Sequence, residues 1–267
     1  VHTLPDITGD LIGGKIGGTN FTNSILVGHA TTGTLSSAEN NTAVGIGALD
    51  AVTSGDNNTV IGKDAGTAIT SGGFNVLMGG SAGESITTTF STTAIGDQSF
   101  KSANQNNNTG LGVSSGLHTT GGDNTAIGKG AGQGSSGSSS YTNVALLGKE
   151  AGKALTTGSH NILLGSTCGD NLTTGSGNVL IGSGIDAAAV DSARTLKIAG
   201  YDGSTTTTWI SGDSNGVVTF ADDIIIKDGG TIGSASDVDA MTISSGGVVT
   251  FSQNPVFPDG GIDLADI

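Results

Sequence analysis

Residues 41–79, NTAVGIGALDAVTSGDNNTVIGKDAGTAITSGGFNVLMG, contain one short motif three times. Each copy starts with asparagine and ends in a large apolar residue followed by a glycine, at positions 45, 62 and 79. The same anchor glycine recurs outside this stretch, with spacings of 16, 17 or 20 residues, at Gly28, Gly96, Gly112, Gly128, Gly148, Gly165 and Gly182. Ten anchors at nearly one spacing are the signature of a repeat protein.

A unit of 17 residues is too short for a pair of helices, and its glycine and β-branched residues disfavour helix. Two short strands joined by tight turns fit this length, so we expect an all-β protein in which each unit forms one coil of a parallel β-solenoid (β-roll). About ten coils at the strand spacing of about 4.8 Å make a rod of roughly 50 Å. We expect an extended docking segment at 1–20, the solenoid at 21–185 and a smaller β-rich C-terminal region at 186–267.

Several columns of residues recur at fixed places in the unit. The residue three places after each anchor is mostly small, and the residue seven places after it is often apolar. The asparagines that open the units predict a ladder of side chains at one turn, each bonded to its neighbours. The residue before the anchor is always large and apolar, and from the second unit onward this column is Val44, Ile61, Met78, Ile95, Leu111, Ile127, Leu147, Leu164 and Ile181.

The anchor strand is apolar on both of its faces. Alternate residues of a strand point to opposite faces, so Val44 and Ile61 lie on one face and Val60 and Leu77 on the other. A coil this thin can bury only one of these faces inside itself. Because a stack of identical columns favours symmetric self-association, we expect the other face to be covered by further copies of the chain.

Composition excludes several classes of function. The formal net charge of −14, from 9 Lys+Arg and 23 Asp+Glu, argues against a nucleic-acid partner. No apolar stretch approaches the roughly 20 residues of a membrane helix, so we expect no membrane insertion. The histidines and Cys168 lack ligand spacing, and we expect no cofactor and no metal. Calcium bound between subunits stays open as an alternative, with the candidate ligands Asp222, Asp223, Asp237 and Asp239.

Enzymatic hydrolysis of glycans would need two carboxylates roughly 5–10 Å apart. The candidates Asp64, Glu84, Asp97 and Glu150 follow their anchors at small offsets, but they occupy different columns or lie several coils apart. No tight pair follows from this register, and we expect a protein that is not an enzyme.

Two aromatic residues are candidates for contact with a receptor. Tyr141 lies beside a three-residue excess in the unit that contains QGSSGSSSYTN, at residues 133–143. Trp209 begins the second region, in STTTTWISG. The alternative is that Tyr141 covers a coil edge and that Trp209 fills the junction between two architectures.

The segments NTAVGIGAL and NTAIGKGAG, with a small residue three places after the anchor, resemble the head repeat of trimeric autotransporter adhesins. That repeat is a left-handed parallel β-roll assembled as a trimer. The same units followed by GVVTF segments, here at 216–220 and 247–251, resemble repeat-containing tail fibres and appendage proteins of marine bacteriophages. The resemblance covers about residues 20–185 well and the remainder loosely.

The resemblance implies a structural virion protein at the particle surface. The sequence shows neither a basic start followed by an apolar core nor the amphipathic strands of a membrane barrel, which favours the phage group. The implied function is that of a homotrimeric phage tail fibre for host attachment, with other virion proteins at one end and a host-surface glycan or protein as receptor. The alternatives are a capsid decoration or head-fibre protein, a bacterial surface adhesin and a glycan depolymerase.

Overall fold

The computed structural model describes residues 14–29, 31–137, 139–221, 224–225, 230–234 and 237–252. These residues form strands and turns without an α-helix, so no helix among them could cross a membrane. The chain divides into two compact units, Val1–Ala221 and Asp222–Ile267. The all-β class predicted from composition is therefore confirmed.

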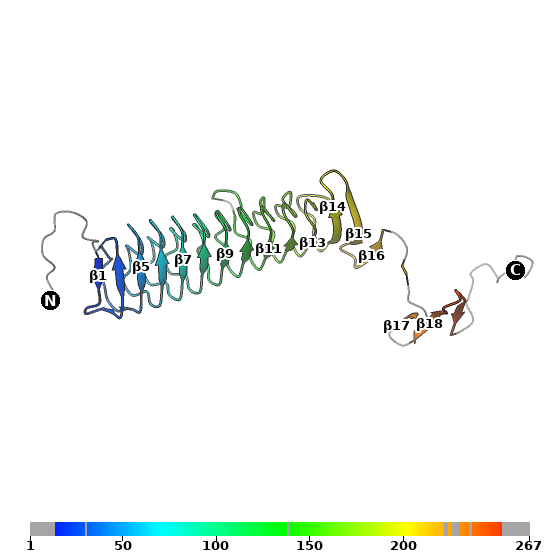
Figure 1. The fold of residues 1–267 in the computed structure, drawn as a ribbon, viewed down its shortest axis with the longest axis horizontal. Coiled ribbons are helices and arrows are strands. Elements are labelled where there is room, and N and C mark those ends of the chain that lie inside the picture. The colour runs from blue at the N-terminus through cyan, green and yellow to red at the C-terminus, as the bar shows by residue number, and fades with distance from the viewer. Residues whose placement is uncertain are drawn as a thin grey trace, which may run out of the picture. The chain divides into compact units, whose positions relative to one another are not determined.

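The first unit is a parallel β-solenoid of about ten turns, as the repeat predicts (Figure 1). Each coil contributes one three-residue strand, and each strand pairs in parallel with the same strand of the next coil. The register places the residue before each anchor beside its equivalent, so Val44 pairs with Ile61 and Ile61 with Met78. These strands are β3 (Ile25–Val27), β5 (Thr42–Val44), β6 (Thr59–Ile61), β7 (Val76–Met78), β8 (Thr93–Ile95), β9 (Thr109–Leu111), β10 (Thr125–Ile127), β11 (Ala145–Leu147), β12 (Ile162–Leu164) and β13 (Val179–Ile181).

The expectation of two strands per coil is wrong for most coils. The remaining sides of each coil are bends and turns, because many of their residues adopt left-handed backbone conformations that a strand cannot contain. These sides still hydrogen-bond to the next coil, as the Thr53 amide does to the carbonyl of Thr70 at 2.9 Å. A second strand pair occurs in the first coils, where β2 (Phe21–Thr22) pairs with β4 (Ala38–Glu39).

The core is a narrow column inside the coils. The middle residue of each three-residue strand points inward, and Leu77, Leu146 and Leu163 are fully or almost fully buried. The small column and the second apolar column pack against them, from Ala65 and Ile69 in one coil to Cys168 and Leu172 in another. Where the inward position is Gly110, the ring of Phe100 from the preceding coil fills the space.

The predicted asparagine ladder is present and buried. Asn58 Nδ2 donates to Asn41 Oδ1 at 3.0 Å and to the carbonyl of Gly72 at 3.0 Å. Its Oδ1 accepts hydrogen bonds from the backbone and side-chain amides of Asn75. Asn58 thus joins three successive coils, which satisfies polar groups that the turn would otherwise leave buried and unpaired. Thr92 and Val144 occupy the same column and interrupt the ladder.

The sheet continues at both ends of the coils. β1 (Gly14–Ile16), which lies in the predicted docking segment, pairs antiparallel with β3. After β13 the chain adds β14 (Leu196–Tyr201) in parallel, then β15 (Thr206–Gly212) and β16 (Val218–Phe220) antiparallel. Residues up to 221 therefore belong to the same unit as the solenoid, past the predicted boundary at 185.

The second unit has a three-stranded antiparallel sheet of β17 (Gly230–Ser234), β18 (Asp237–Ile243) and β19 (Val249–Phe251). The turn before β19 matches the turn before β16. Ser244 Oγ accepts the amide of Val248 at 3.0 Å, and Asp213 Oδ1 accepts the amide of Val217 at 3.0 Å. The 31-residue GVVTF repeat is thus a repeated turn and strand.

Candidate functional site

The outward side of the parallel sheet is a surface feature that runs along all the coils. We use the term outer face for the side of this sheet that is formed by the first and third residues of β3 and of β5 to β13. The register stacks the third residues into the column predicted from the anchors, and these side chains are half-exposed, for example Val44 at 41 % and Leu147 at 50 %. This column therefore lies outside the coil, whereas the middle residues form the core.

The outer face changes in character along the sheet. In the first coils the column of first residues is mostly threonine, as at Thr42, Thr59 and Thr93, beside the apolar column. From β11 onward both columns are apolar, with Ile162 next to Leu164 and Val179 next to Ile181 in successive coils. A continuous apolar stripe of this length is typical of an interaction surface, because isolated chains rarely expose contiguous apolar patches.

Of the two predicted receptor residues, Tyr141 is fully buried. Its ring lies in the core and its hydroxyl donates to the carbonyl of Gly132, while burial raises the pKa of the phenol. A receptor could not reach Tyr141 without opening the coil. Its unit has Ser135 at the position of the second apolar column, and the buried ring of Tyr141 supplies an apolar group to the core of this coil.

Trp209, in contrast, is exposed over 56 % of its surface. It lies on the hairpin of β14 and β15, at a register shift after Ile198 that leaves it without a direct partner on β14. Tyr201, which the sequence analysis did not single out, is on the same hairpin and is also exposed. The signal that could have found it is its position eight residues before Trp209, across a short turn.

Three of the carboxylates considered for hydrolysis pair with lysines, and the charge of Asp64 also acts on Glu84. Asp64 forms an ion pair with Lys63, Glu84 with Lys101 at 3.1 Å, and Glu150 with Lys153 at 3.6 Å. A hydrogen bond from Ser81, followed by the contact with Lys101, lowers the pKa of Glu84, which is the opposite of what a general acid needs. Asp97 lies on a neighbouring coil against Gly80.

A carboxylate pair that the register did not reveal forms between Asp170 and Asp186. Burial raises the pKa of Asp170, and the charge of Asp186 and a hydrogen bond between the two side chains raise it further. Asp170 follows its anchor by five residues, whereas Asp186 lies where the regular coil ends, so only the folded chain brings the two together.

This pair leads to a pH-dependent prediction. Because folding raises the pKa of Asp170, the protonated form stabilises the fold, and this stability is lost as the pH rises through the folded-state pKa. We expect Asp170→Asn to melt at a higher temperature than the parent chain at pH 7. The difference should disappear as the pH falls below the ordinary aspartate pKa of about 3.9. Asp191→Asn, an equal charge change at an exposed site, is the control; equal melting shifts for both variants would contradict the prediction.

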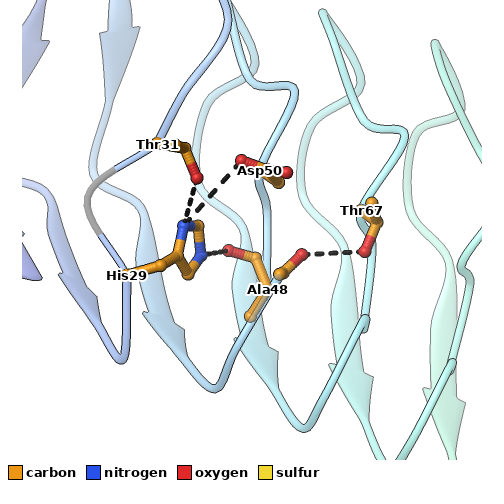
Figure 2. Close-up of polar contacts among 6 residues, drawn as sticks. His29, Thr31, Ala48, Asp50 and Thr67 are labelled. Carbon is orange, nitrogen blue, oxygen red and sulfur yellow. Dashed lines mark hydrogen bonds and ion pairs between the residues drawn. The ribbon is translucent and has the colours of Figure 1, made fainter. Parts of the chain in front are cut away.

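His29 forms a polar cluster between the first two coils (Figure 2). Its Nε2 lies 2.7 Å from the carbonyl of Ala48, which can only accept, so neutral His29 carries its proton on Nε2. Its Nδ1 then accepts from the hydroxyl of Thr31 at 2.9 Å and lies 3.8 Å from Asp50. The contacts join the turn after β3 to the next coil, much as Thr67 bonds to the carbonyl of Gly47.

No metal site emerges from the described ranges, in which no three histidine, cysteine, aspartate or glutamate side chains are grouped so that they could hold a metal ion. Of the candidate calcium ligands, Asp222 and Asp223 lie outside the described residues, as do the side chains of Asp237 and Asp239. Cys168 is buried, donates to the carbonyl of Leu180 at 3.3 Å, and has its pKa raised to about 11 by burial. It is a packed thiol in the small-residue column.

Comparison with known protein families, with curated proteins and with solved structures found no match for this chain. The class of this protein therefore follows from its fold and its outer face alone. The chain is a β-solenoid repeat protein with one buried column and one exposed apolar sheet face.

Proposed function

We propose that this chain is a structural appendage protein of a virus particle, a homotrimeric tail fibre of a bacteriophage that mediates attachment to the host surface. The observation that supports this proposal is the outer face: an apolar stripe that runs along the parallel sheet and is exposed in the single chain. The resemblance of the repeat to trimeric adhesin heads and phage appendages supplies the trimeric state and the virion location.

The outer face suits assembly from identical copies. Each coil presents its own third residue at the same place, so a symmetry axis parallel to the solenoid brings each such residue beside its equivalents, layer by layer. Val44, Met78 and Leu147 would then meet Val44, Met78 and Leu147 of the other copies. Burial of such side chains stabilises by about 1.5–3 kcal/mol each when complete, and roughly half of that remains to be gained here.

The proposed role is mechanical and adhesive, and it requires no catalysis or cofactor. Hydrogen bonds between coils run along every side of the solenoid, which makes a stiff shaft. A trimer presents three identical contact sites, so that weak individual contacts with the host surface combine through avidity. The acidic charge of −14 is compatible with partners other than nucleic acid.

The test of assembly is the native mass of the protein and of one charged variant. We expect the parent chain to have three times the 25.9 kDa of one copy, in a species that survives detergent but not boiling. Leu147→Asp places a charge on the outer face and should shift the mass towards that of one copy. A monomeric parent chain would contradict the proposal.

The matched control is Val190→Asp. Val190 is exposed over 52 % of its surface, nearly the same as Leu147 at 50 %, but it lies in a turn outside the outer face. This variant should keep the mass of the parent chain. If both variants dissociate equally, the outer face is not the interface.

The virion location has its own test, which is quantitative mass spectrometry of purified particles. A tail fibre should occur in a small number of copies divisible by three. A copy number that matches the capsid lattice would favour a decoration or head-fibre protein instead, and absence from the particle would contradict the virion assignment.

A further inference from the structure

The hairpin of β14 and β15, which we call the cap hairpin, holds two exposed aromatic rings, those of Tyr201 and Trp209. Its strands are longer than those of the coils, six and seven residues instead of three. The register pairs Gly200 with Thr207 and Tyr201 with Thr206 at the end of the hairpin. The strand pair thus extends three residues past the level of Ile198, the last position that pairs with a coil strand.

Both rings lie against glycines. A Cβ atom built on Gly200 would come within 2.7 Å of Cζ2 of Trp209, so the indole lies directly on the backbone of β14. A Cβ atom built on Gly184, in the last coil, would come within 3.1 Å of Cδ1 of Tyr201. Because these glycines have no side chain, the rings can pack on the backbone, and 56 % of Trp209 and 45 % of Tyr201 remain exposed.

The rings border a shallow depression of about 290 Å³, lined by Gly200, Tyr201, Asp202, Thr205, Thr207 and Trp209. Its floor is rigid, because Asp202 Oδ1 accepts the amides of Ser204 at 2.9 Å and of Thr205 at 2.7 Å. The volume is slightly below the roughly 300 Å³ at which pockets for drug-sized ligands begin. It therefore suits one small ring.

The charge of the depression narrows the class of ligand. Among the residues that line it there is no lysine, arginine or histidine. Hydrogen bonds from the backbone of Thr205 and Ser204 lower the pKa of Asp202, so its carboxylate stays ionised. Phosphate, nucleotides and acidic sugars would be repelled. A complementary ligand needs an apolar side for the rings and hydroxyl groups for Asp202, Thr205 and Thr207.

We propose that the cap hairpin is a binding site for a neutral pyranose unit of a surface glycan. The sugar's CH face stacks on Trp209 or Tyr201, and its hydroxyls bond to Asp202 and the threonines. The inference rests on the attachment role proposed above and names its ligand class. One site per copy gives three in a trimer, which compensates for the weak affinity expected of a shallow site.

Trp209 is the only tryptophan of the chain, so its fluorescence reports on this site alone. We expect the emission of the assembled parent chain to change in a saturable way with a neutral sugar from a panel of glucose, galactose, mannose, rhamnose and N-acetylglucosamine. Inorganic phosphate and glucuronate should have no effect. Tyr201→Ala and Asp202→Asn should each weaken binding, Tyr201→Ala by up to roughly tenfold.

Asp213→Asn is the matched control, because Asp213 caps the turn after β15 in the same way but does not line the depression. It should bind like the parent chain. Three results would overturn the inference: no response to any neutral sugar, responses unchanged in Tyr201→Ala and Asp202→Asn, or an indole shielded from acrylamide in the assembled protein. The last would mean that a second copy covers Trp209.

Native mass measured on the same samples separates this inference from the proposed function. If the protein is a trimer and no sugar of the panel changes its Trp209 emission, the glycan site is overturned and the appendage proposal still stands. If the protein is a monomer that binds a neutral sugar, the trimeric appendage proposal is contradicted and the glycan site still stands.

Discussion

Gly79→Ala should destabilise the solenoid strongly, because the added methyl group would clash with the backbone of the next coil. The φ angle of Gly79 is 141°, which residues with a side chain rarely adopt, and an added Cβ atom would lie 2.5 Å from the carbonyl oxygen of Gly96. The clash is with the backbone of the next coil and not with a flexible side chain, so relief requires the two coils to move apart. We expect a loss of about 4 kcal/mol or more in the free energy of unfolding, measured by urea denaturation.

Gly137→Ala separates the cost of a left-handed φ angle from the cost of the clash with the next coil. Gly137 also has a left-handed φ, of 71°, but an added Cβ atom there would meet no atom within 4 Å. This control should lose only the conformational cost of about 1–2 kcal/mol. Similar losses for both variants would show that the close approach of coils at the anchor glycines does not limit stability.

Asn58→Ala should have the second largest effect, because it removes the central member of a buried ladder. Without the side chain, the amide groups of Asn75 lose their acceptor, and Asn41 Oδ1 and the carbonyl of Gly72 lose a donor. Each buried group left unpaired costs about 1–3 kcal/mol. We expect a total loss of about 4 kcal/mol, measured by thermal or urea unfolding.

Adding an asparagine where the ladder is interrupted tests the contribution of the same hydrogen bonds. Thr92 stands in the asparagine column of a 17-residue unit, and its hydroxyl, like that of Thr89, is buried without a hydrogen-bond partner. Thr92→Asn should rebuild the ladder between Asn75 and Asn108 and raise stability by about 1 kcal/mol. A loss of stability in Thr92→Asn together with a neutral Asn58→Ala would show that the ladder does not stabilise the fold.

The candidate site was only partly predictable, and Tyr141 and Trp209 illustrate why. Both are aromatic residues beside irregular segments, and the sequence offers no difference between them. In the folded chain Tyr141 lies in the core of a coil that lacks the second apolar residue, whereas Trp209 lies on a strand pair that extends beyond the coils. Tyr201 joins Trp209 only through the pairing of β14 with β15. The Asp170–Asp186 pair likewise depends on how the last coil ends.

The repeat alone determined the parallel solenoid, its number of coils, the buried small-residue column and the asparagine ladder. This was possible because parallel stacking puts equivalent residues one above another, so that a period in the sequence becomes a column in space. Only the tertiary structure decided which apolar face of the anchor strand is inside. Val60 and Ile61 belong to columns that repeat with the same period, so the period does not distinguish them. In the folded chain Val60 lies in the core and Ile61 on the surface. The sheet also continues past the predicted boundary at residue 185: Leu196–Ile198 pairs with β13 without an anchor glycine, because backbone hydrogen bonds extend a sheet whatever the side chains are.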